Sequence, residues 1–232
     1  TLAAGRQTRD AGVWLGRGQC IEQYGPGEPY MPILEALGRL GREPDGERLI
    51  AVLQQHAPTW LVQMPALLSA AEREVVQRQT QGATRERMLR EMGDAIDALT
   101  AERPLVLWLE DLHWTDASTL ELLALLARRR EPARLLVIGT YRPVDIIVQE
   151  HPLRGVVQEL QLHGQCKDLP LGFLSETQVA EYLATRFRVP SPASAGEGQG
   201  EGLSAVPLQT LAKVIHRRTD GNPLFMVTAV ED

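Results

Sequence analysis

One short apolar run that ends in two acids constrains the fold of this chain more than any other feature. The run Leu105–Leu109 lies between Pro104 and the pair Glu110-Asp111. A continuous apolar run of this length is typical of a strand buried on both faces, as in a parallel sheet. Ligands bind at the carboxyl ends of such strands, so both acids are candidate site residues. The same pattern also fits two acids that only cap the strand and face solvent.

The residues that follow this run predict a βαβ unit. Asp116 is a candidate helix N-cap, Leu120–Ala127 predicts an apolar helix that Pro132 ends, and Arg134–Thr140 predicts a second buried strand. A strand, a helix and a strand at this spacing form a parallel pair with a right-handed crossover. The sequence therefore predicts an α/β fold around a parallel sheet.

Polar residues at the end of the second strand extend the candidate site. Because neighbouring parallel strands end at the same edge of a sheet, we expect Thr140 and Arg142 to lie beside Glu110 and Asp111. An arginine there can grip a terminal phosphate through two parallel hydrogen bonds. It can equally form an ion pair with one of the two acids, and the pattern leaves both roles open.

Helices are expected on either side of this unit. Residues 30–101 predict a helical insert, because apolar residues recur every three or four positions and prolines divide the stretch. The other expected elements are a short strand at Val13–Cys20, a helix at Leu153–Leu162, a short strand at Lys167–Leu171 and helices at 175–187, at Pro207–Arg218 and from Leu224. We expect a core at 1–172 and a helical second region at 173–232. The second region contains a flexible linker at 190–202.

Composition narrows the function classes. The chain has 24 basic and 30 acidic residues and a net charge of −6, so we expect no direct nucleic-acid contact from this segment. No stretch approaches the roughly 18 apolar residues of a membrane span, and no secretory leader is recognisable. Cys20 and Cys166 match no metal-binding spacing, which favours a reducing, cytoplasmic location.

Three strings resemble one family of signalling ATPases. They are LVLWLEDLHWTD at 105–116, LLVIGTYR at 135–142 and GNPLF at 221–225. Together they are similar to the STAND class of P-loop ATPases, and most similar to the bacterial AAA-type ATPases that accompany nucleotidyl cyclase or transcriptional-activator domains. The resemblance implies a P-loop NTPase-like parallel sheet with a helical insert and a C-terminal helical lid, with ATP and Mg²⁺ as cofactors.

The resemblance also implies residue roles. Glu110 matches the Walker B acid that holds Mg²⁺, and Asp111 matches the acid that positions the attacking water. Thr140 and Arg142 match the sensor segment near the γ-phosphate, and Pro223 matches the lid proline that packs on the adenine. The family's pairs often run Asp then Glu, so Asp111 is one methylene shorter than the usual second acid.

One motif of the family is missing. A phosphate-binding loop of the form Gly-x-x-x-x-Gly-Lys-Ser/Thr occurs nowhere in the sequence, and neither Lys167 nor Lys213 follows such a glycine frame. The resemblance places that loop upstream of Val13–Cys20. We therefore expect a chain that begins after the loop, a sheet without its first strand, and a gap beside Leu135–Ile138 or a collapse of Lys167–Leu171 onto it.

Two functions follow from these expectations. The first is the ATP-binding and ATP-hydrolysing switch domain of a bacterial multidomain regulator, with cyclase-like or DNA-binding effector domains attached elsewhere. Its activity would depend on the complete protein, and the segment alone would bind ATP weakly. The second is a non-enzymatic interaction module that has lost nucleotide binding.

Overall fold

The computed structural model describes residues 12–22, 28–129, 131–187 and 205–231. The chain divides into two units, Thr1–Lys167 and Asp168–Asp232, and each unit is described by itself. The linker predicted at 190–202 lies outside the described residues. Among the helices of the described ranges, none is long and apolar enough to cross a bilayer.

A three-stranded parallel sheet forms the centre of the first unit. Its strands are β1 (Trp14–Gln19), β2 (Leu105–Glu110) and β3 (Leu135–Gly139), in the order β1-β2-β3. In the register, Gln19 lies opposite Glu110 and Leu109 lies opposite Gly139. The predicted α/β class with a parallel βαβ unit is confirmed.

The prediction that both apolar strands are buried on both faces is wrong. In β2, Leu105, Leu107 and Leu109 are buried, whereas the alternate residues are only half-buried. In β3, Leu136 is 55% exposed. The consecutive residues Val137 and Ile138 are also exposed, so the described elements leave both faces of β3 poorly covered. Within the described residues, β3 is an edge strand that pairs with β2.

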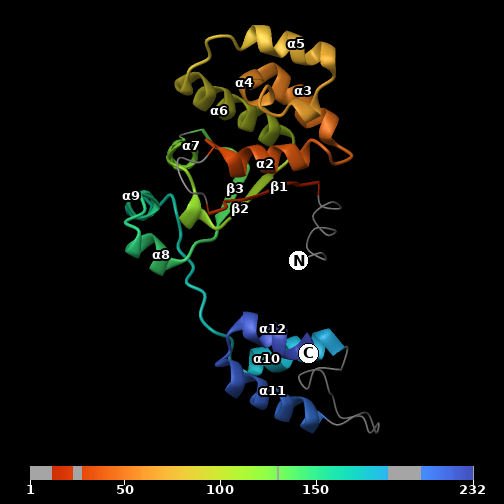
Figure 1. The fold of residues 1–232 in the computed structure, drawn as a ribbon, viewed down its shortest axis with the longest axis vertical. Helices are drawn as coiled ribbons and strands as arrows, with labels where there is room; N and C mark the ends of the chain where they lie inside the picture. The colour runs from red at the N-terminus through yellow and green to blue at the C-terminus, as the bar shows by residue number, and fades with distance from the viewer. Residues whose placement is uncertain (1–11, 23–27, 130, 188–204, 232) are drawn as a thin grey trace. The chain divides into compact units, whose positions relative to one another are not determined.

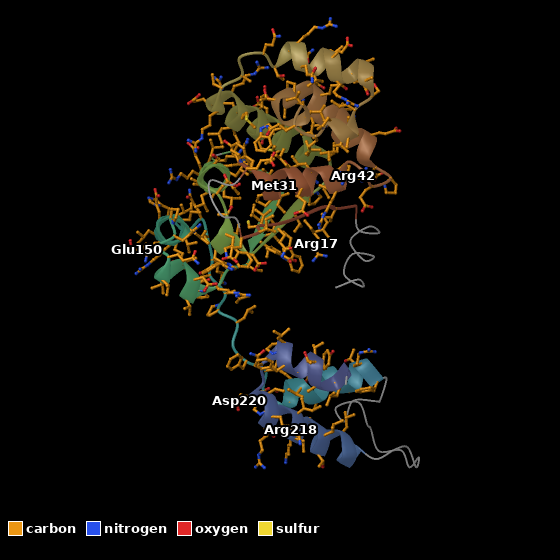
Figure 2. All side chains as sticks on the ribbon, in the orientation of Figure 1. Arg17, Met31, Arg42, Glu150, Arg218 and Asp220 are labelled. Atoms are coloured by element: carbon orange, nitrogen blue, oxygen red, sulfur yellow. The ribbon has the colours of Figure 1, made fainter. Side chains whose placement is uncertain are left out.

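Helix α2 (Met31–Leu40) packs against β1 and brings the helical region onto the sheet. The contact depends on small residues in the strand, because a Cβ at Gly18 would lie 1.8 Å from the carbonyl oxygen of Pro32. Trp14, Gly16 and Gly18 face α2, so the alternation of the strand places Leu15, Arg17 and Gln19 on the opposite face. Figure 2 labels Arg17 on that side.

The stretch expected as a helical insert folds as a compact group of helices between β1 and β2, here termed the insert. Figure 1 shows this group on the side of α2 that faces away from the sheet. Its members are α3 (Gly46–His56), α4 (Pro58–Leu61), the 3₁₀ turn η1 (Pro65–Leu67), α5 (Ala70–Gln79) and α6 (Arg85–Glu102). Ser69 and Glu72 form a capping box at the start of α5, and Thr84 caps α6.

The core of the insert is apolar with one buried acid. Trp60, Leu49, Leu53 and Ile96 are almost fully buried between α3, α4 and α6. Glu91 is also buried, and its carboxylate accepts hydrogen bonds from the Thr59 backbone N–H at 2.8 Å and from Arg87 Nε at 2.7 Å. Burial of that carboxylate is tolerated because it is paired and hydrogen-bonded.

The crossover and the elements after β3 complete the first unit. They are the 3₁₀ turn η2 (Leu112–Trp114), α7 (Ala117–Ala127), α8 (Pro143–Val148) and α9 (Leu153–Leu162). Asp116 caps α7 as predicted, accepting from the Thr119 backbone N–H at 2.9 Å. An ion pair between Arg128 and Glu159 links α7 to α9 at 2.6 Å.

The second unit contains α10 (Glu176–Phe187), α11 (Ala205–Thr219) and α12 (Pro223–Glu231). These helices share a small core of Val179, Leu183, Ala212, Ile215 and Met226. The strand predicted at Lys167–Leu171 is wrong, since these residues form no regular element. Pro170 lacks a backbone donor, and the flanking Leu169 and Leu171 are 74% and 87% exposed.

Candidate functional site

The two acids after β2 lie at the carboxyl edge of the sheet, beside the end of β3. Asp111 adopts a left-handed conformation, with φ 59° and ψ 43°, which turns the chain sharply after Glu110. Its backbone N–H donates to Thr140 Oγ1 at 3.1 Å, and the Leu112 N–H donates to the Thr140 carbonyl at 2.8 Å. The structure thus brings Thr140 against the acidic turn.

The close fit of this turn depends on Gly139. A Cβ there would lie 2.3 Å from Cδ1 of Leu112, at the end of a buried side chain, so a larger residue would require the Leu112 side chain to move. The contact packs η2 against the end of β3.

Strand β1 contributes two donors that the sequence did not single out. Arg17 Nη2 lies 3.2 Å from Glu110 Oε1 and its guanidinium lies 4.8 Å from the ring of Trp108. Gln19 Nε2 donates to Asp111 Oδ2 at 3.1 Å. Pairing β1 with β2 and following the alternation of side chains would have revealed both residues, because Arg17 and Gln19 share a face with Glu110.

Arg142 lies at the start of α8 and pairs with a different acid from either of those expected. Its Nη1 lies 3.9 Å from Asp145 Oδ2, and its guanidinium lies 5.9 Å from the centre of the Trp114 ring. The alternative that Arg142 pairs with Glu110 or Asp111 is therefore not what the structure shows. The Arg142 side chain is 68% exposed, which leaves most of the guanidinium accessible to an anion.

Two histidines lie close to this edge, although the sequence suggested only scattered packing or surface roles. His113 is 1% exposed, and its ring centre lies 4.5 Å from that of Trp114. His151 Nδ1 accepts from the Leu153 N–H at 3.2 Å, so Nε2 carries the proton and donates to the Thr115 carbonyl at 3.1 Å. Burial lowers the pKa of His151, and the neighbouring His113 lowers it further.

A cavity of about 610 Å³ lies next to this edge, between the end of β1 and the start of α7. Cys20, His113, Thr115 and His151 contribute to its wall, but neither acid of the Glu110-Asp111 pair does. The pKa of the Cys20 thiol is raised to about 11, mainly by burial and to a lesser extent by the nearby carboxylates of Asp116 and Asp111. The thiol is therefore protonated at neutral pH.

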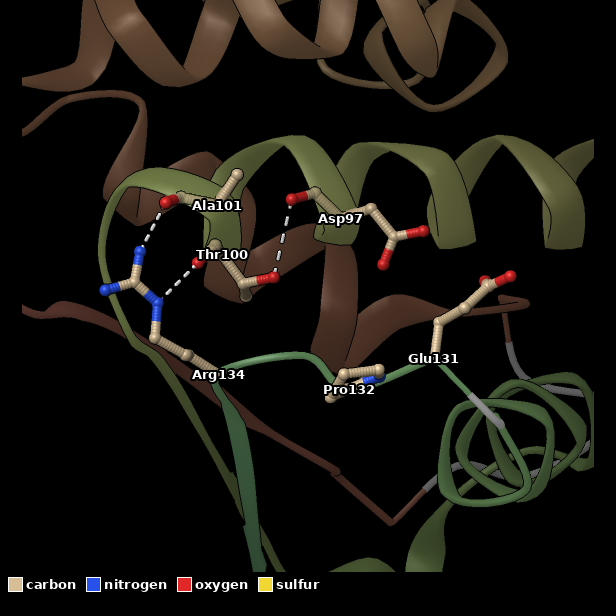
Figure 3. A pocket seen from close by; sticks show the side chains of 6 residues that line it. All are labelled: Asp97, Thr100, Ala101, Glu131, Pro132 and Arg134. Carbon is tan, nitrogen blue, oxygen red and sulfur yellow. Dashed lines mark hydrogen bonds between the residues drawn. The ribbon is translucent and has the colours of Figure 1, made fainter.

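A second hollow, of about 400 Å³, lies at the opposite, amino end of the strands (Figure 3). There Arg134 donates to the carbonyl oxygens of Thr100, at 2.7 Å, and Ala101. These are carbonyls from the last turn of α6, so Arg134 caps that helix. Ligands of parallel sheets bind at the carboxyl edge, and we assign the Arg134 hollow a structural role.

The acids fit one part of a nucleotide site. Carboxylate oxygens suit Mg²⁺, which usually binds one or two carboxylates together with phosphate and water. The side chain of Glu110 is 37% exposed at the strand end, so its oxygens are within reach of such an ion. Within the described ranges, no cluster of three or more metal-binding side chains occurs. The acids would therefore hold Mg²⁺ jointly with a nucleotide.

The remaining predicted site residue, Pro223, belongs to the second unit. It begins α12, and the side chain of Asn222 accepts a hydrogen bond from the backbone N–H of Leu224 at 3.0 Å. The structure thus places Thr140 against the Glu110-Asp111 turn, whereas Arg142, two residues further on, pairs with Asp145. Pro223 lies in the other unit.

The fold and the site define the class of this protein. A parallel sheet with paired acids at the carboxyl end of its middle strand, next to a hydroxyl that follows the neighbouring strand, is typical of nucleotide-binding α/β domains. The family model described as the AAA ATPase domain matches residues 2–138. The chain belongs to this family. No curated protein and no solved structure matches it.

Proposed function

We propose that the complete protein that contains this chain binds ATP with Mg²⁺ and hydrolyses it slowly, using the nucleotide state as a conformational switch. The observation that carries this proposal is the position of Glu110 and Asp111 at the carboxyl edge, where Thr140 contacts Asp111 and Arg142 follows two residues later in the chain. Glu110 would hold Mg²⁺, which supplies positive charge to the phosphates. Asp111 would orient the attacking water, and Arg142 would contact the terminal phosphate.

The same proposal includes the position of the phosphate-binding loop. No described residue pairs with the outer edge of β3, and the sequence contains no Gly-x-x-x-x-Gly-Lys frame. We propose that residues N-terminal to Thr1 contribute the loop and its strand. We further propose that the complete protein is a multidomain regulator of the STAND class. Its lid would include Pro223, and its effector domains would lie outside this chain.

Three substitutions in the complete protein test the roles of the site. Asp111→Asn should leave ATP binding largely intact and lower turnover by about 10²–10⁴-fold, since it removes a positioned catalytic group. Asparagine also tolerates the left-handed backbone of residue 111, so the fold is preserved. Glu110→Gln should weaken the Mg²⁺-dependent part of binding, and Arg142→Ala should uncouple nucleotide binding from the switch.

The measurements are steady-state ATP turnover and MgATP titration, with Glu74→Gln on α5 as the control. Glu74 forms an exposed pair with Arg78 far from the sheet, so this control should behave as the parent does. If both acid variants hydrolyse ATP at the parental rate, the site is assigned to the wrong residues. Absence of ATP binding by the complete protein would instead favour the non-enzymatic interaction module.

A further inference from the structure

Asp145 joins the two segments that carry the proposed site. Its Oδ2 lies 3.5 Å from Nε2 of His113 and 3.9 Å from Nη1 of Arg142. His113 belongs to η2, two residues after Asp111, whereas Asp145 lies in the first turn of α8. A single carboxylate oxygen therefore faces one group from the acidic turn and one from the segment after β3.

The His113 side of this contact is rigid. The imidazole is completely enclosed, with none of its side-chain surface exposed, and it packs against Trp114. Neither ring nitrogen makes a hydrogen bond to another described group, and the carboxylate of Asp145 lies in contact with Nε2. A side chain packed this closely cannot change rotamer without opening a void. His113 is therefore a stationary neighbour against which the Asp145 carboxylate lies.

The Arg142 side of this contact is less enclosed than the His113 side. Its side chain is long and mostly exposed, so many rotamers are open to it, and its contacts are with the Asp145 carboxylate and the Trp114 ring. A guanidinium held in one place loses less freedom when it grips a phosphate. The contacts that hold the Arg142 guanidinium therefore lower the entropy that it loses when it binds a phosphate.

We propose that Asp145 is a positioning residue that, backed by His113, holds the guanidinium of Arg142 at the carboxyl edge for the terminal phosphate. This inference rests on the proposed function, because it assigns a phosphate as the anion that Arg142 meets. Asp145 does not touch the phosphate itself. Its effect passes entirely through Arg142, and that dependence can be measured.

A double-mutant cycle in the complete protein tests the dependence. Asp145→Asn should lower ATP turnover by about twofold to tenfold with little change in KM, the range expected for residues in contact. In the Arg142→Ala background the same substitution should have no further effect. Asp145→Glu, which keeps the charge, should restore part of the turnover. Glu121→Gln, which breaks an exposed pair with Arg85 on α6, is the matched control.

A second cycle, read by urea unfolding, tests the anchor without using activity. Asp145→Asn and His113→Asn should be non-additive in the unfolding equilibrium constant, by more than about twofold. Should His113→Asn fail to fold, His113→Gln takes its place. Additive effects would show that His113 does not anchor Asp145.

The kinetic outcomes separate this inference from the proposed function. An equal loss of turnover from Asp145→Asn with and without Arg142 overturns the positioning role while the ATPase assignment stands. A complete protein that neither binds nor hydrolyses ATP overturns the proposed function, and with it the positioning of Arg142 for a phosphate. The unfolding cycle would in that case still report the contact between His113 and Asp145.

Discussion

At the scale of single residues, burial controls the chemistry of the side chains around the carboxyl edge. Cys20 is 3% exposed, and burial raises the pKa of its thiol to about 11. Only the thiolate reacts with electrophiles. At pH 7 a thiol with this pKa is ionised in about one molecule in ten thousand, so the native protein protects Cys20 both by enclosure and by its protonation.

We predict that Cys20 in the native chain resists alkylation. In the Cys166→Ser variant, the rate of iodoacetamide labelling of Cys20 should be very low at pH 7 and rise about tenfold with each pH unit towards pH 11. Mass spectrometry over time measures this rate. Labelling of the urea-unfolded variant is the control and should be fast. Native labelling as fast as the unfolded control would contradict the buried position.

The lowered pKa of His151 predicts that the stability of the fold decreases at acidic pH. Its pKa is lowered in the folded state, so between the ordinary value of 6.5 and the folded value the unfolded chain binds more protons. Stability is therefore fully present above about pH 6.5 and falls as the pH drops below it. Urea unfolding at several pH values should show this fall. His151→Gln, which keeps a donor for the Thr115 carbonyl, should flatten it, and an unchanged slope would contradict the assignment.

At the scale of elements, a buried carboxylate on α6 links α6 to α4 within the helical insert. Glu91 on α6 accepts hydrogen bonds from both the backbone N–H and the Oγ1 of Thr59 on α4, and from Arg87 on its own helix. These contacts satisfy the buried carboxylate. Removing the carboxylate would leave those donors unpaired inside the insert.

We predict that Glu91→Ala lowers the free energy of unfolding by about 1–3 kcal/mol, the cost of leaving a buried hydrogen-bond donor without its partner. Glu74→Ala is the control, because Glu74 on α5 is 71% exposed in its pair with Arg78 and such pairs contribute at most about 1 kcal/mol. Thermal and urea unfolding measure both variants. Equal losses of unfolding free energy in the two variants would contradict a stabilising role of the Glu91 hydrogen bonds.

At the scale of the whole molecule, the free edge of β3 is the feature with the largest consequence. Leu136, Val137 and Ile138 are at least one-third exposed on a strand that, among the described residues, pairs with β2 alone. An unpaired apolar edge favours pairing with other chains. We therefore predict poor solubility of the isolated chain, and backbone amides in β3 that exchange with deuterium faster than those of β2.

Leu136→Lys tests this edge in two settings. In the isolated chain the substitution should raise the soluble, monomeric fraction with little loss of stability, because edge lysines oppose strand pairing. In the complete protein it should destabilise the fold, if a further strand covers β3 as proposed. Size-exclusion chromatography and urea unfolding provide the measurements. Equal protection of Leu136–Ile138 and Val106–Leu109 in a soluble monomer would show that the edge is already covered.

The sequence by itself determined the local elements of this protein and the edge at which its acids lie. Apolar periodicity, prolines and caps such as Asp116 identified the helices, because these signals act between near neighbours in the chain. Apolar runs identified β2 and β3 and, through their parallel order, the approach of Thr140 to Asp111. The strand assigned at Lys167–Leu171 failed, because a few apolar residues without a pairing neighbour do not make a strand.

Only the tertiary structure decided which groups meet across that edge. Burial on both faces was expected of β2 and β3 from their composition, but burial depends on what other segments cover, and β3 lies uncovered. The partners of the site residues, Arg17 for Glu110, Gln19 for Asp111 and Asp145 for Arg142, follow from strand order and from the turn into α8. Residues distant in the chain are brought together by packing, which local patterns do not encode.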